Sequence, residues 1–273
     1  MNNEIIQLDN RIVFSLNGKD SIDFLQSIVT IDLENTKQDF FSSCLLTPQG
    51  KLFHHFFLFK QKDGFLLDVH HKSSESLKEK IGFYKLMSNI NIEDRPDLEV
   101  ISTTEQIFPD MRLDPRNNNL GWRGIRKKTG EITNNLNLYE TKKISLCIVE
   151  DGEDIAPSEY FPMELNYDIL NTISFNKGCF IGQEVTSRMH RKGRIKKRIF
   201  PFKHEEQDIK KGEIHFENKK IGQIIKVTQD NGIALLRTDS FKSIKDHSNK
   251  VLVNGEESTL IFSIPDGLNI NVQ

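Results

Sequence analysis

The chain has 273 residues, enough for two or three compact units and a sizeable buried core. Its formal net charge is −2, so no global field recruits nucleic acid or membrane. No stretch approaches the roughly 18 apolar residues of a membrane-spanning helix, and residues 1–11 lack the basic start and apolar run of a targeting signal. We therefore expect a cytoplasmic protein that does not enter a membrane, and we expect it to be a monomer.

The number and spacing of the cysteines limit the metal sites that the chain can form. Cys44, Cys147 and Cys179 lie far apart and form no C-x-x-C pair. This spacing argues against a disulfide framework and against a zinc module. It also supplies too few thiolates for an iron–sulfur cluster of the chain's own. No resident metal is expected, and any metal would be shared with a partner or a ligand.

The first 105 residues predict a mixture of strands and helices. Residues 5–16 alternate like two strands around a polar turn, and residues 22–28 carry apolar side chains at helical spacing. A hairpin follows, with a turn that contains Pro48 and Gly50. The pattern then predicts a third strand at residues 65–69 and a helix that is capped by Ser73 or Ser74 and extends to residue 84 or 85. Two strands at residues 90–92 and 98–101 are expected to continue the same sheet.

The later part of the chain changes in character. A helix is expected over residues 136–149. Beyond Gly193 the pattern is one of short strands separated by turn signals, at residues 198–202, 213–216, 220–227, 233–236, 251–253 and 259–262. A small antiparallel barrel accommodates such a run. The whole is therefore expected to be an α+β fold that ends in a β-barrel.

Residues 177–184, Lys-Gly-Cys-Phe-Ile-Gly-Gln-Glu, are called the octet below. Gly178 and Gly182 free the backbone, which predicts a tight turn around Cys179. A helix is expected to begin near Gly182 and to end at Gly193. Its dipole and Lys177 would both favour the thiolate, which makes Cys179 a candidate reactive thiol. The alternative is that Cys179 is a small buried hydrophobe.

The octet resembles the signature of the YgfZ family, folate-binding relatives of the glycine cleavage T-protein, an aminomethyltransferase. Further similar segments follow in order: FLQ at residues 24–26 with Thr30 and Asp32, LTPQGK at 46–51, DPR at 114–116, LGWR at 120–123, FPMELN at 161–166 and ALLR at 234–237. The resemblance extends from about residue 8 to about residue 265. One segment departs from it, because residues 147–150 are Cys-Ile-Val-Glu where family members often have Gly-Ile-Pro-Glu.

The resemblance implies a three-part, T-protein-like architecture. Its parts are a discontinuous folate-binding core (residues 1–44 and 106–193), an inserted α+β domain (45–105) and a C-terminal antiparallel β-barrel (194–273). It also implies that the protein binds tetrahydrofolate or a one-carbon derivative. The implied role is to assist assembly or repair of iron–sulfur clusters in client enzymes, including radical enzymes that modify tRNA.

Several residues are candidates for this site. Cys179 and Lys177 are the predicted functional pair, and the predicted folate-binding residues are Glu164, Gly178, Gln183, Glu184, Arg188 and Arg116. Each acidic or amide side chain has an alternative role in capping a nearby helix. For Arg116 and Arg123 the alternative role is to brace a domain boundary through a buried ion pair. His54, His55, His70 and His71 are given no role, because neighbours on a strand point to opposite faces.

A basic run offers a second kind of function. Residues 188–198 carry seven Lys or Arg and no acid. They suit a folate polyglutamate tail, a phosphate backbone or an acidic partner, and equally a solvated helix end. Few aromatic residues interrupt the run, so direct nucleic-acid binding is not expected. An aminomethyltransferase is the enzymatic alternative, but no carboxylate constellation suited to that acid–base chemistry is evident.

Overall fold

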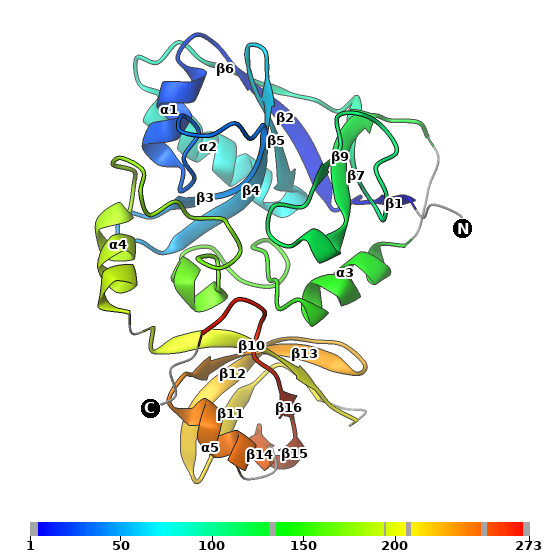
Figure 1. Ribbon diagram of the computed structural model, residues 1–273, viewed down its shortest axis with the longest axis vertical. Coiled ribbons are helices and arrows are strands. Elements are labelled where there is room, and N and C mark those ends of the chain that lie inside the picture. The colour runs from blue at the N-terminus through cyan, green and yellow to red at the C-terminus, as the bar shows by residue number, and fades with distance from the viewer. Residues whose placement is uncertain (1–4, 131–134, 194, 206–208, 247–249, 270–273) are drawn as a thin grey trace.

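The computed structural model describes residues 5–130, 135–193, 195–205, 209–246 and 250–269. Two sheets and four of the helices form the N-terminal part, and a third sheet lies below them as the C-terminal part (Figure 1). This confirms the predicted α+β fold with a C-terminal antiparallel barrel. Among the described helices, none has the length and apolar character needed to cross a bilayer.

The first sheet is antiparallel and has the strand order β3-β4-β5-β2-β6. Its strands are Arg11–Asn17 (β2), Phe40–Leu46 (β3), Leu52–Gln61 (β4), Gly64–His70 (β5) and Asn91–Asp94 (β6). Helices α1 (Ser21–Ile28) and α2 (Ser74–Lys85) pack against it, and Leu25 and Leu77 share a core with Phe14 and Phe56. The predicted hairpin is confirmed as β3 and β4.

The second sheet has the strand order β1-β7-β9-β8. Its strands are Ile5–Gln7 (β1), Leu98–Thr103 (β7), Arg112–Leu113 (β8) and Trp122–Lys127 (β9). The prediction that residues 98–101 continue the hairpin sheet is wrong, because β7 pairs with β1 and β9 instead. The division into units at residues 44 and 105 stays a prediction; residue 44 itself lies inside β3.

Helix α3 (Leu136–Ser145) is shorter than expected. Cys147 has a φ of 56°, which lies in the left-handed region and cannot continue a helix. This is the position at which the resembling family often has glycine. Short 3₁₀ helices η1 (His71–Ser73), η2 (Asn118–Leu120) and η3 (Pro162–Leu165) complete the N-terminal part with α4 (Gln183–Lys192).

The third sheet is a nearly closed antiparallel barrel with the order β15-β14-β11-β12-β13-β10-β16. Its strands are Lys197–Lys203 (β10), Glu213–Phe216 (β11), Lys219–Val227 (β12), Asn231–Arg237 (β13), Lys250–Val253 (β14), Glu256–Thr259 (β15) and Ile261–Phe262 (β16). Phe200, Ile214 and Leu236 fill its core together with Phe241 of α5 (Ser240–Asp246). The sequence missed β15, which is mostly exposed and lacks apolar residues.

Candidate functional site

The octet forms a turn that is fixed at both ends. At its end, Gly182 has a φ of 79° and begins α4, as predicted. A Cβ atom on Gly182 would lie 2.6 Å from the carbonyl oxygen of Thr47 in the β3–β4 turn. The two turns therefore touch backbone to backbone, which only glycine allows. Gly178 is different, because a Cβ there would meet no atom within 4 Å.

Lys177 anchors the start of the octet. Its side chain is buried, and Nζ donates hydrogen bonds to the carbonyl oxygens of Gln26, Val29 and Ile31, at 2.8, 2.7 and 2.8 Å. These acceptors lie at and just beyond the C-terminal end of α1, where a cation also complements the helix dipole. Backbone carbonyls thus engage all three ammonium hydrogens, and the predicted action of Lys177 on Cys179 stays a prediction.

Replacing Lys177 by methionine is expected to lower the free energy of unfolding at neutral pH by about 1–3 kcal/mol, because buried carbonyls lose their donors. Burial, partly offset by Asp32, lowers the pKa of Lys177 to about 8, whereas an unfolded lysine titrates near 10.4. The folded state releases this proton first, so the wild type should gain stability relative to the variant between about pH 8 and pH 10.

Urea unfolding at neutral pH and near pH 10 measures both effects of the Lys177 change. Lys19→Met is the matched control, since Lys19 is an exposed lysine just before α1. Equal stability of Lys177→Met and wild type at both pH values would contradict the anchoring role.

Cys179 is exposed at the middle of this anchored turn. The alternative that it is a buried hydrophobe is therefore wrong. Cys44 and Cys147 are buried, and burial raises the pKa of both thiols well above the usual value. Of the three cysteines, Cys179 alone is accessible to a partner or a ligand.

The side chains that follow Cys179 in the octet and in α4 have different roles. Gln183 Nε2 donates to the carbonyl oxygens of Lys177 and Gly178, at 3.3 and 3.1 Å, so this amide holds the turn. Glu184 and Arg188 are exposed on α4. Thr186 is the buried side chain of the helix.

The residues predicted to bind tetrahydrofolate have different contacts. Glu164 Oε2 accepts a hydrogen bond from the backbone N–H of Phe161, 3.0 Å away, and so caps η3. Arg116 is buried among charged side chains remote in sequence from the octet. Gly178, Gln183, Glu184 and Arg188 lie on the octet and α4. Glu164 and Arg116 are thus held by contacts within the fold, and a folate site that uses all six residues stays a prediction.

A cavity of about 570 Å³ is lined in part by Ile173 and Ser174, which lie shortly before the octet in the chain. Phe40, Phe41 and Ile173 supply apolar walls, and Asp39 and Arg112 form an ion pair in its lining with Nη2 and Oδ2 2.6 Å apart. The volume suits a small molecule. None of the residues predicted to bind folate lines this cavity.

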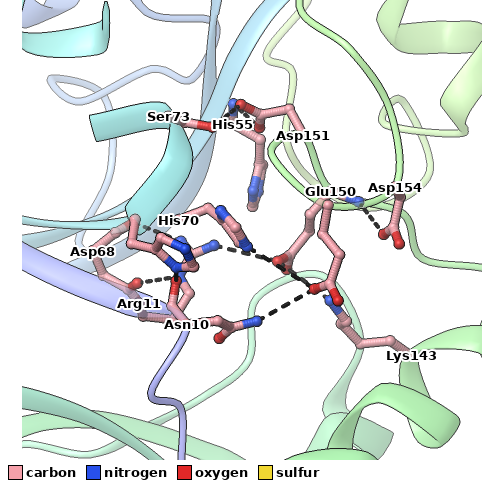
Figure 2. Close-up of polar contacts among 12 residues, drawn as sticks. Asn10, Arg11, His55, Asp68, His70, Ser73, Lys143, Glu150, Asp151 and Asp154 are labelled. Atoms are coloured by element: carbon pink, nitrogen blue, oxygen red, sulfur yellow. Dashed lines mark hydrogen bonds and ion pairs between the residues drawn. The ribbon is translucent and has the colours of Figure 1, made fainter. Parts of the chain in front are cut away.

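A buried network of charges lies at the centre of the N-terminal part (Figure 2). Arg11 Nε donates to Asp68 Oδ1 at 2.6 Å, and Arg11 Nη1 donates to Glu150 at 3.2 Å. Arg116 donates to Glu150 as well as to Asp114, with Nη2 2.8 Å from Oδ2. Arg116 thus forms the buried ion pair that the alternative role requires, but Asp114 and Glu150 lie in the same predicted unit as Arg116, so the bracing of a domain boundary stays a prediction.

The network extends through further side chains. Arg123 donates to Asp68 and to the Tyr139 hydroxyl, both at 2.7 Å, and so forms the buried ion pair expected of it; its bracing of a domain boundary stays a prediction. Lys143 Nζ lies 3.3 Å from Glu150. Burial alone would raise the pKa of Glu150, but Lys143, Arg116 and Arg11 outweigh it and hold the pKa well below its usual value. Glu150 is thus an ionised carboxylate shared by three cations.

The segment after Glu150 ties further elements together. Asp151 accepts from Ser73 Oγ at 2.7 Å and from the backbone N–H of His55 at 2.7 Å, and the ring of His54 lies 2.6 Å away. Asp154 pairs with Lys226 of β12, 2.6 Å apart, so the same segment reaches the barrel. Histidines that were given no role therefore have structural ones.

His55 and His70 are neutral members of this network. Burial lowers the pKa of His55 well below its usual value, and burial together with Arg11 lowers the pKa of His70 to about 4. His55 Nδ1 is buried and has no hydrogen-bond partner. Within the described ranges, no group of three or more His, Cys, Asp or Glu side chains is placed to hold a metal ion.

The whole chain resembles a solved aminomethyltransferase in its fold. It superposes on glycine cleavage system aminomethyltransferase T from Bartonella henselae with a TM-score of 0.71, 12% identity and coverage of 96% of this chain and 86% of that one. This likeness confirms the T-protein-like fold, and at 12% identity it shows the fold alone.

Residues 196–269 match the family model described as "CAF17, C-terminal beta-barrel domain". Sequence relatives include the mitochondrial iron-sulfur cluster assembly factor IBA57 homolog of Pyricularia oryzae, 31% identical over 71% of this chain and 56% of the relative. Mouse IBA57 is 26% identical over 86% of this chain and 78% of its own length. The chain is similar to IBA57 proteins over most of its length and to the CAF17 barrel over residues 196–269. The alignment spans little more than half of several of these relatives.

These relatives correct the expected location. Their names place them in mitochondria, which contradicts the prediction of a cytoplasmic protein. That prediction depended on two absences, of a targeting signal in residues 1–11 and of an apolar membrane-spanning stretch.

Proposed function

We propose that the protein is an iron–sulfur cluster assembly factor in which Cys179 is the functional thiol. The names of its relatives support the general role. The observation that carries the assignment to Cys179 is its exposure on a turn that is anchored by Lys177 and by the contact between Gly182 and Thr47. A thiol held in a fixed position can bind iron, or attack, with little reordering of the chain.

Membership of the YgfZ family, tetrahydrofolate as the ligand and clients among the radical enzymes that modify tRNA belong to the same proposal. They are supported by the resemblance that the octet and the similar segments along the chain carry. Glu164 and Arg116, two of the residues predicted to bind folate, have partners within the fold. Folate binding therefore needs its own test. Calorimetric titration of the full chain with tetrahydrofolate, wild type against Cys179→Ala, provides it, and absence of heat in both would remove the folate from the proposal.

The test of function uses cells that lack the protein and carry a plasmid copy. Cys179→Ser is expected to leave the activity of a [4Fe–4S] client enzyme at the level of cells without the protein, because a hydroxyl cannot replace a thiolate as nucleophile or iron ligand. Asn176→Ala, an exposed neighbour in the same loop, is the control and should rescue fully. Full rescue by Cys179→Ser would exclude Cys179 as the functional thiol.

A further inference from the structure

The later part of α4 carries exposed cations, and the one acid of the helix, Glu184, lies in its first turn. Arg188, Arg191 and Lys192 are exposed and spaced three and four residues apart, so they share one face of the helix. Lys196 and Lys197 are exposed directly beyond it. These five side chains are called the cationic stripe. In Figure 1, α4 lies at the edge of the molecule, between the first sheet and β10.

The cationic stripe differs from the other basic residues nearby. Within the described ranges, no ion pair joins its five side chains to an acid. Arg198, which follows directly, is buried and pairs with Asp168 at 2.7 Å. Exposed cations of the barrel also pair locally, Arg237 with Asp239 and Lys250 with Glu257. The stripe is therefore a patch of one sign on a chain whose net charge is −2.

The stability of the fold accounts for only part of this arrangement. Like charges three and four residues apart destabilise a helix. The helix dipole favours cations in the last turn, which accounts for Arg191 and Lys192 singly. It does not account for Arg188, which lies earlier, or for Lys196 and Lys197, which lie outside the helix. A negative surface from outside the molecule would offset the repulsion.

We propose that the cationic stripe docks an acidic surface of a partner protein and so holds that partner over Cys179. The role beside Cys179 rests on the proposed function, whereas the docking rests on the charge pattern. Cys179 lies in the turn that leads into α4. Arg188 lies five residues beyond the start of the helix, which is about 8 Å along its axis at 1.5 Å per residue. A protein interface of ordinary size covers both.

Geometry and charge favour a protein over a nucleic acid. Single strands bind by stacking bases on exposed aromatic rings. The aromatic ring beside α4, Phe175, is covered by the ring of His190, with centroids 3.6 Å apart. A net charge of −2 also gives no general attraction to a polyanion. An acidic patch on a protein can bind the cationic stripe without a net positive charge on the whole chain.

The test reverses two charges in the full chain. Arg188→Glu with Arg191→Glu is compared with wild type and with a matched control, Lys210→Glu with Lys211→Glu, two exposed lysines of the barrel. The probes are a fluorescein-labelled decapeptide rich in Glu and Asp and a single-stranded DNA of equal charge, followed by fluorescence anisotropy at low and physiological salt. Circular dichroism checks that both variants fold.

The peptide is expected to bind wild type and control alike, and the stripe variant about tenfold more weakly. Equal peptide binding by the stripe and control variants would overturn the proposal, as would tighter binding of DNA than of peptide to the wild type. In cells, the stripe variant should lower client enzyme activity. If the stripe variant keeps full client activity and Cys179→Ser loses it, the docking proposal is rejected and the proposed function stands. If both variants keep full activity, the proposed function is rejected as well.

Discussion

Replacing Glu150 by glutamine is expected to lower the free energy of unfolding at neutral pH by about 3–5 kcal/mol, because a buried ionic partner is removed. Arg11, Arg116 and Lys143 share this carboxylate, and all four side chains are buried. Without it, the three cations keep their desolvation cost and lose a carboxylate that all three contact. Chemical denaturation followed by circular dichroism measures the change.

The pH dependence of the Glu150 effect has a definite sign. An unfolded glutamate titrates near 4.3, and the folded pKa is held well below that value. The stabilisation is therefore fully present above about pH 4.3 and is lost as the pH falls towards the folded pKa. The difference in stability between wild type and Glu150→Gln should shrink over this acidic range.

Glu153→Gln is the control for Glu150→Gln, since it makes the same chemical change three residues away. The Glu153 side chain is 43% exposed, and its nearest polar contacts are 3.5 Å to Asn10 and 3.9 Å to a neutral His70. Its loss should cost less than about 0.5 kcal/mol. Similar losses in the two variants would show that the central network contributes no special stability.

Local pattern determined what the sequence could predict of the fold. The β3–β4 hairpin and α4 were found because their signals, a Pro-Gly turn and two flanking glycines, lie within a few residues of the element. The partners of β7 were not found, because pairing with β1 joins segments more than 90 positions apart and local periodicity does not encode it. The end of α3 depended on a single backbone angle at Cys147.

The candidate site divides in the same way. The octet was recognised because its residues are contiguous, and the exposure of Cys179 agrees with its predicted role. The central network was largely missed, because Arg11 and Glu150 are 139 positions apart. Two signals were present: Asp68 interrupts the otherwise apolar strand residues 65–69, and four acids crowd residues 150–154. A lone acid in a buried strand requires a buried cation.

The second large effect is expected in the octet itself. Gly182→Ala should lower the free energy of unfolding by about 2–4 kcal/mol, since alanine is strained at a left-handed φ and its methyl group would crowd a backbone oxygen. The φ of Gly182 is 79°, and the new Cβ would lie 2.6 Å from the oxygen of Thr47 and 3.0 Å from Cβ of Leu46. Relief of this crowding requires the octet to move away from the β3–β4 turn.

Gly178→Ala provides a control within the same octet, because its Cβ would enter open space and its backbone is not in the left-handed region. It should change the stability by less than about 0.5 kcal/mol. If the position of the Cys179 thiol matters for function, Gly182→Ala should also reduce client enzyme activity, although the thiol itself is unchanged. Gly178→Ala should leave client enzyme activity unchanged. Full client activity in a folded Gly182→Ala protein would mean that Cys179 tolerates displacement, and that its exposure matters more than its fixed position.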